Sequence, residues 1–124
     1  MANPNLLAAT TVSGVTATLT PGSTAATVLL SNAASSSTVM RINQIVAANV
    51  NGTSAVDVTV TINSAAAGGG TAFPIASTIS VPPDASLIVV DKTTGLYLME
   101  DKSIVVTSGT SSGITYSISY ELIA

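Results

Sequence analysis

The chain has 124 residues and a net charge of −3, and it contains no Cys, no His and no Trp. These absences exclude His-dependent catalytic triads, thiol nucleophiles, thiolate metal sites and disulfides. Three cationic side chains on an acidic chain are too few to neutralise the phosphates of a nucleic acid. The composition therefore predicts a protein with no catalytic residues, no cofactor, no metal and no nucleic-acid partner.

Hydrophobic residues make up 47% of the chain and charged residues only 7%, where about 25% charged is typical of soluble domains. The segment before Arg41 has no charge, but Pro4, Pro21 and Gly22 interrupt it. No window supplies the roughly 20 consecutive apolar residues of a spanning helix. The first residues also lack the basic region of a secretory signal. We expect neither a membrane partner nor an export signal.

Residues 1–11 are small and weakly patterned, which suits an extended N-terminal arm. A frayed terminus and an arm that packs on a neighbouring subunit both fit this segment. The following residues, 12–124, form the predicted folded domain.

Alternation of apolar and polar residues in this domain predicts β-strands. The pattern is clearest in residues 55–63 and 113–122. In residues 38–50 it places Met40, Ile42, Val46, Ala48 and Val50 on one face, with Gln44 as a polar exception. The expected strands are 15–20, 25–31, 38–50, 55–63, 71–81, 86–91, 96–99, 103–107 and 113–122.

Turn signals separate these strands, and Asn51-Gly52 is the strongest hairpin signal among them. No segment has a helical period with caps. Turns every 8–12 residues or so, with no helix between them, predict an all-β fold: a single antiparallel β-sandwich of about nine strands. Jelly-roll and immunoglobulin-like topologies both remain open.

The few charged residues fit ordinary structural roles. Adjacent Glu100 and Asp101 are typical of a solvated turn. Arg41 is the one arginine, and an ion pair with Asp57 or Glu121, within or between subunits, explains it more simply than ligand recognition does.

Most of the expected strands carry no Lys or Arg, although charged residues are a usual protection of exposed sheet edges. Residues 45–50 and 87–90 combine strand propensity with low charge, as aggregation-prone segments do. The edges therefore predict a homo-oligomer or a place in a larger lattice.

Nearly the whole chain resembles a group of small virion structural proteins of tailed phages, particularly cyanophages. The resemblance rests on residues 1–10 (MANPNLLAAT), 42–53 (INQIVAANVNGT), 81–92 (VPPDASLIVVDK), 96–101 (LYLMED) and the terminal Tyr120-Glu121. It implies a β-sandwich subunit of the virion, on the capsid or on the neck and tail, that is assembled in the host cytoplasm.

The leading hypothesis is a capsid decoration, or cement, subunit on the capsid exterior. Its expected partners are the major capsid protein and further copies of itself, with a trimer expected by analogy with other cement proteins. Strand edges and the arm would bridge neighbouring subunits. The candidate partner-binding residues are Asn3, Pro4, Leu6, Leu7 and Arg41.

Two alternatives remain. The first is a neck, tail or fibre-base component. The second is a module that binds glycans or a host surface, with recognition by the loop tips 68–71 and 108–112 and sugar stacking on Phe73 or Tyr97.

Overall fold

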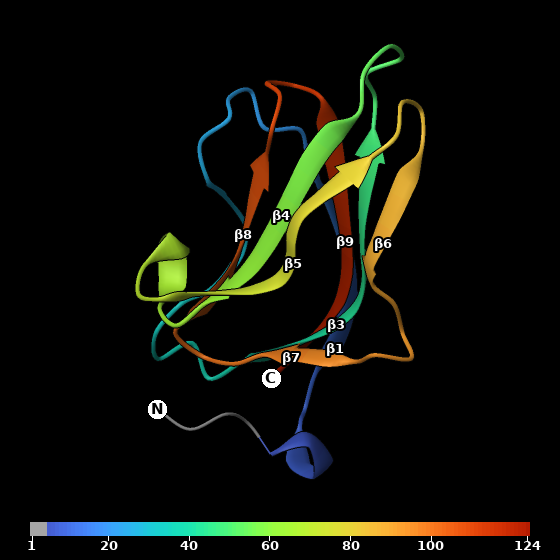
Figure 1. The fold of residues 1–124 in the computed structure, drawn as a ribbon. Coiled ribbons are helices and arrows are strands. Elements are labelled where there is room, and N and C mark those ends of the chain that lie inside the picture. Colours follow the sequence, from blue (N-terminus) through green and yellow to red (C-terminus); the bar gives the residue numbers. More distant parts are fainter. Residues whose placement is uncertain (1–4) are drawn as a thin grey trace.

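The computed structural model describes residues 5–124, which form two antiparallel β-sheets packed face to face (Figure 1). Sheet A consists of β1 (Val12–Leu19), β9 (Ile114–Ile123), β3 (Val39–Asn49), β6 (Ser86–Val90) and β7 (Leu96–Leu98). Sheet B consists of β2 (Thr27–Asn32), β8 (Lys102–Ser108), β4 (Val56–Asn63) and β5 (Ala72–Val81). The predicted all-β sandwich with nine strands is confirmed.

The strand order decides between the two topologies. Sheet A runs β1-β9-β3-β6, with β7 also paired to β3, and sheet B runs β2-β8-β4-β5. Consecutive strands mostly lie in opposite sheets, which is the jelly-roll arrangement, with β6 and β7 sharing the place of one strand. In an immunoglobulin domain, by contrast, consecutive strands such as the first two pair within one sheet. The fold is a jelly roll.

The core lies between the sheets, and it follows the predicted alternation in β4 and β9. Val56, Val58 and Val60 of β4 are at most 1% exposed. In β9 the alternate side chains of Ile114, Tyr116 and Ile118 are fully buried. These positions face inward because successive side chains of a strand point to opposite faces.

The prediction for β3 is wrong in its second half. The register pairs Ile42 with Tyr120 and Gln44 with Ser119, so Asn43 is an extra residue. Such a bulge moves the following side chains to the opposite face. Ile42 is buried as predicted, but the next core residues are Ile45, Ala47 and Asn49, while Val46 and Ala48 are only half-buried and Val50 is 55% exposed.

The arm departs from its predicted extended form. Residues Leu6–Ala8 make one turn of 3₁₀ helix, η1, in which the backbone N–H of Leu7 donates to Asn5 Oδ1 at 3.0 Å. The backbone N–H groups of Thr10 and Thr11 donate to Ala124 O at 2.8 and 3.1 Å. These bonds fix the base of the arm beside β9, and η1 projects beyond the sandwich (Figure 1). Asn3 and Pro4 lie outside the described residues.

Within residues 5–124, no helix is long and apolar enough to cross a membrane.

Candidate functional site

The sheet edge formed by β1 is long, regular and uncharged. Its eight residues pair with β9 without a register shift, from Val12 opposite Ile123 to Leu19 opposite Tyr116. The strand contains no charged residue and no proline, and Val12 is 58% exposed. The side of β1 that faces away from β9 has no neighbouring strand among the described residues. Such an edge can accept a strand from another chain.

The other edges of the sandwich carry protection that β1 lacks. On β5, Pro74 lacks the backbone N–H group that a neighbouring strand would need, and two register shifts distort the pairing with β4. Thr78 of the same strand adopts a positive φ of 50°. β2 has a register shift between Val28 and Leu30, and β6 is only five residues long. Prolines, bulges and short length all discourage edge pairing. In residues 5–124, β1 is thus the one edge without these features.

Of the predicted partner-binding residues, Leu6 and Leu7 lie on η1, 47% and 99% exposed. Arg41 is exposed on the outer face of sheet A, where the register sets it opposite Glu121 on one side and Tyr97 on the other. The Glu121 carboxylate accepts a hydrogen bond from Asn43 Nδ2 at 3.3 Å. Asp57 lies in sheet B, so it is not the intramolecular partner of Arg41.

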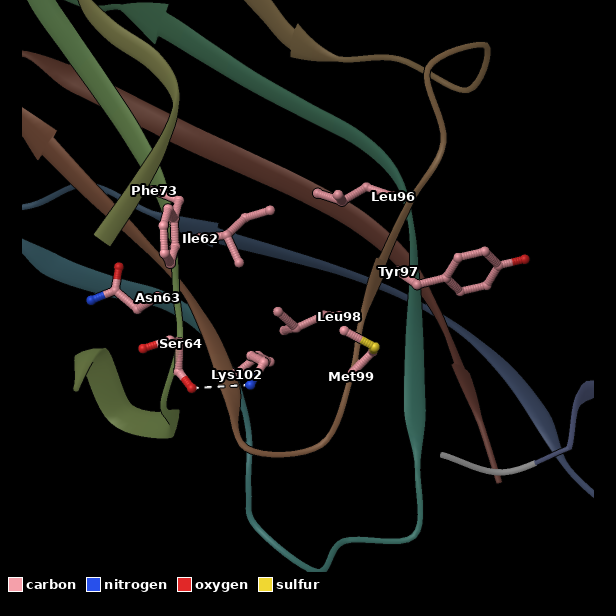
Figure 2. Close-up of a pocket in the computed structure, with 9 residues that line it drawn as sticks. All are labelled: Ile62, Asn63, Ser64, Phe73, Leu96, Tyr97, Leu98, Met99 and Lys102. Atoms are coloured by element: carbon pink, nitrogen blue, oxygen red, sulfur yellow. Dashed lines mark hydrogen bonds between the residues drawn. The ribbon is translucent and has the colours of Figure 1, made fainter. Parts of the chain in front are cut away.

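A pocket of about 290 Å³ opens between the two sheets, where β4 and β5 approach β7 (Figure 2). Ile62 of β4 and Leu98 of β7 line it from opposite sheets. Both aromatic residues proposed for sugar stacking border this pocket, but the Tyr97 ring points away from Ile62 and Leu98. The full lining is Ile62, Asn63, Ser64, Phe73, Leu96, Tyr97, Leu98, Met99 and Lys102.

The polar groups of the pocket are occupied by bonds within the chain. Lys102 Nζ donates to Ser64 O at 3.1 Å, the dashed line in Figure 2. The amide of Asn63 donates to Gly68 O at 2.9 Å, and its oxygen accepts from the Thr61 hydroxyl at 2.8 Å. The surface that remains free to contact a bound group is mainly apolar. This lining suits an aliphatic side chain better than a sugar, which needs several polar partners.

The two loops proposed for recognition do not form one surface. Residues 108–112 lie beside the start of β4, where Gly109 N donates to Asp57 O at 2.8 Å. Residues 68–71 follow the other end of β4. There the short helix η2 (Ala66–Gly68) is held by bonds such as that from Gly68 N to Ser103 Oγ at 2.9 Å. Any glycan site would therefore use one of these loops, without the other.

The acidic residues are partly structural, which corrects one prediction. Glu100 is only 8% exposed, and Asp101 Oδ1 accepts from Ala66 N at 3.1 Å, so this turn is not simply solvated. The hydrogen bond from the Thr93 hydroxyl lowers the pKa of the exposed Asp91 carboxyl below its ordinary value of 3.8. Among residues 5–124, no group of three or more His, Cys, Asp or Glu is placed to hold a metal ion.

Sequence reasoning missed the pocket as a unit. Its lining comes from four strands or their ends, β4, β5, β7 and β8, and only the packing of sheet A on sheet B brings Phe73 near Leu98. The only signal in the sequence was the lack of charge in residues 96–99. The structure shows that this uncharged segment is partly at the surface, where Met99 is 45% exposed.

No protein-family model matches the chain, and no curated protein matches its sequence. Among solved structures, the chain is similar to a Bacillus endospore appendage protein, described as one of a novel family of disulfide-linked pili. The identity is 16%, the alignment covers 99% of this chain and 95% of that chain, and the TM-score is 0.54. At this identity the likeness extends to the fold alone.

Proposed function

We propose that the chain is a non-enzymatic structural subunit of a virion, which decorates the exterior of the capsid and stabilises the shell. The observation that carries this proposal is the unprotected β1 edge. A soluble monomer gains nothing from an uncharged, regular edge and runs the risk of aggregation. A subunit of a repeating particle can use the same edge for binding.

The mechanism is mechanical. A strand added to β1 would form main-chain hydrogen bonds and would bury side chains such as Val12 and Val15, which are 58% and 36% exposed. Each contact is modest, because burial contributes about 25 cal/mol per Å² of apolar surface. Repetition over a lattice multiplies these contacts, so a shell that bears internal pressure is reinforced at many points.

The structural neighbour supports a role in an assembly of repeated subunits. Its fold is used in pili, which are polymers of many copies. The present chain has no cysteine, so its own assembly would be non-covalent. The resemblance to cyanophage virion proteins is what directs the proposal to a capsid, with the major capsid protein and further copies, arranged as trimers, as partners.

Substitution of one edge residue tests the role of β1. Thr18 is exposed on this strand, and Lys at that position would introduce the charge that edges usually carry. We expect Thr18→Lys to lower the affinity for capsids, or for further copies, at least tenfold while the melting temperature stays unchanged. The matched control is Thr24→Lys, which adds the same charge in an exposed loop outside the strands. Equal binding by both variants would exclude the β1 edge as the surface that binds capsids or further copies.

Location in the particle tests the virion role itself. Cryo-electron microscopy of purified virions should show density repeated over the capsid shell, and capsids without the protein should open at a lower temperature. A single ring at the neck or tail would favour the alternative component there. Glycan affinity that is lost in Phe73→Ala, with assembly intact, would favour a binding module.

A further inference from the structure

The arm presents an apolar side chain that its own domain does not cover. Leu7 is 99% exposed and the adjacent Leu6 is 47% exposed. The neighbouring residues of the arm carry no charged side chain, so this part of the surface is apolar. Their turn has a local cause, since Asn5 accepts hydrogen bonds from Leu7 N and Ala8 N, both at 3.0 Å. The base of the arm is fixed at Ala124. Leu7 is thus held outward on a short, anchored support.

The pocket between the sheets has the complementary chemistry. Its volume of about 290 Å³ is about twice that of an apolar cavity that accepts benzene, so one or two leucine side chains fit. Its lining is mostly aliphatic or aromatic, and Lys102 and Asn63 have internal partners. Lys102 and Asn63 can keep these internal hydrogen bonds when an apolar side chain enters.

In the structure the arm does not reach the pocket of its own domain, since Leu7 is 99% exposed and neither leucine lines that pocket. Thr11 pairs with Ala124 in line with β1, and β7 lies three strands away in the order β1-β9-β3-β7. Three strand spacings amount to about 14 Å, and the pocket lies beyond them, toward sheet B. The four residues from Thr11 to Leu7 span at most about 14 Å when fully extended. The helical turn of η1 shortens this reach further.

We propose that Leu6 and Leu7 of one copy insert into the pocket between β5 and β7 of a second copy. This inference rests on the proposed assembly function and specifies which surfaces meet. The two surfaces differ, so the contact is head-to-tail: repeated, it closes into a ring, such as the expected trimer, or runs on as an open filament. With no cysteine in the chain, hydrophobic burial holds the contact.

The absence of native cysteine permits a direct crosslinking test. Leu7→Cys and Met99→Cys are made as separate full-length proteins, one of them ¹⁵N-labelled, mixed and mildly oxidised. Met99 borders the pocket and is 45% exposed, so its substitution should not disturb the fold. We expect the yield of the mixed disulfide between Leu7→Cys and Met99→Cys to be at least tenfold higher than the yield between Leu7→Cys and Thr24→Cys. Thr24 is the control because it lies in an exposed loop outside the pocket.

Equal yields for Met99→Cys and the control would overturn the proposal. A second result would also overturn it. If the double variant Leu7→Cys with Met99→Cys forms its disulfide only within one chain at every protein concentration, the arm covers the pocket of its own domain. Either result leaves the virion role intact if the protein still binds capsids.

Sedimentation velocity separates the inference from the proposed function. We expect Leu7→Ser to weaken self-association at least tenfold, and Val50→Ser, which removes a 55% exposed apolar side chain elsewhere, to leave it unchanged. Self-association that is lost in Thr18→Lys and kept in Leu7→Ser would sustain the assembly function and reject the arm contact.

Discussion

Tyr116 is the one aromatic side chain that is fully buried in the core, among residues 5–124, and its hydroxyl group offers a sharp test of the packing. The hydroxyl lies 3.0 Å from Ser108 Oγ and donates to Thr107 O at 3.2 Å. Ser108 is itself fully buried. Tyr116→Phe preserves the ring and removes only the group that pairs with Ser108.

The expected cost follows from the partners left behind. A buried polar group without a hydrogen bond costs about 1–3 kcal/mol, so Tyr116→Phe should lower the free energy of unfolding by about 2 kcal/mol. For a domain of this size, the melting temperature typically falls by about 4 °C for each kcal/mol of lost stability, so it should fall by about 8 °C here. Circular dichroism during heating and urea titration measures both quantities.

The double variant Tyr116→Phe with Ser108→Ala provides the control. It removes both hydroxyl groups and leaves no unpaired Ser108, so it should recover much of the lost stability. A double variant no more stable than Tyr116→Phe would refute the reasoning, as would a loss below about 0.3 kcal/mol in the single variant, well under the cost of an unpaired group.

The same residue predicts a pH dependence. Burial raises the pKa of Tyr116 above its ordinary value of 10.0. Below pH 10 the tyrosine is protonated in both the folded and the unfolded chain, and its contribution to stability is complete. Above that pH the unfolded chain ionises first, so stability should fall as pH rises, and Tyr116→Phe should reduce this loss in urea titrations.

Three further predictions concern other parts of the fold. Asn32→Ala should cost about 2–3 kcal/mol in urea unfolding, because Asn32 Nδ2 bonds to Thr38 O and Leu98 O, and unchanged stability would contradict this bridge. Gly70→Ala should cost about 2 kcal/mol or more in thermal unfolding, since φ is +71° and a Cβ would lie 2.2 Å from Ser64 Oγ, whereas Gly22→Ala, with open space around it, should be neutral. Thr93→Val should raise the Asp91 pKa toward 3.8 in an NMR titration, and an unchanged midpoint would show that this hydroxyl does not set it.

The sequence allowed the strands to be placed well, because alternation and turn residues are local signals. Each of the nine strands overlaps its predicted range. The failure in β3 also has a local origin in one residue. Asn43 bulges out of the ladder with β9, and the one break in the alternation, the polar Gln44, was read as an exception and not as a change of face, so the inward face of Ile45 and Ala47 was missed.

Buried polar residues were equally invisible in the sequence. Asn32 and Asn49 are 1% and 3% exposed, although asparagine usually lies at the surface. Each is buried because its amide satisfies backbone groups of segments distant in the chain: Asn49 Nδ2, for example, donates to Val81 O at 2.8 Å. Such partners are known only once the sheets are packed.

The amino-acid sequence by itself determined the strands, the absence of His and Cys side chains and the low charge of the strands, since these depend on residue type and spacing along the chain. Tertiary structure alone decided the jelly-roll order, the exposure of β1 as an edge and the pocket between β5 and β7. The physical reason is that edges and pockets are formed by the pairing and packing of strands far apart in sequence. Local propensity specifies each strand, while the burial of one face of each sheet against the other sheet selects their arrangement.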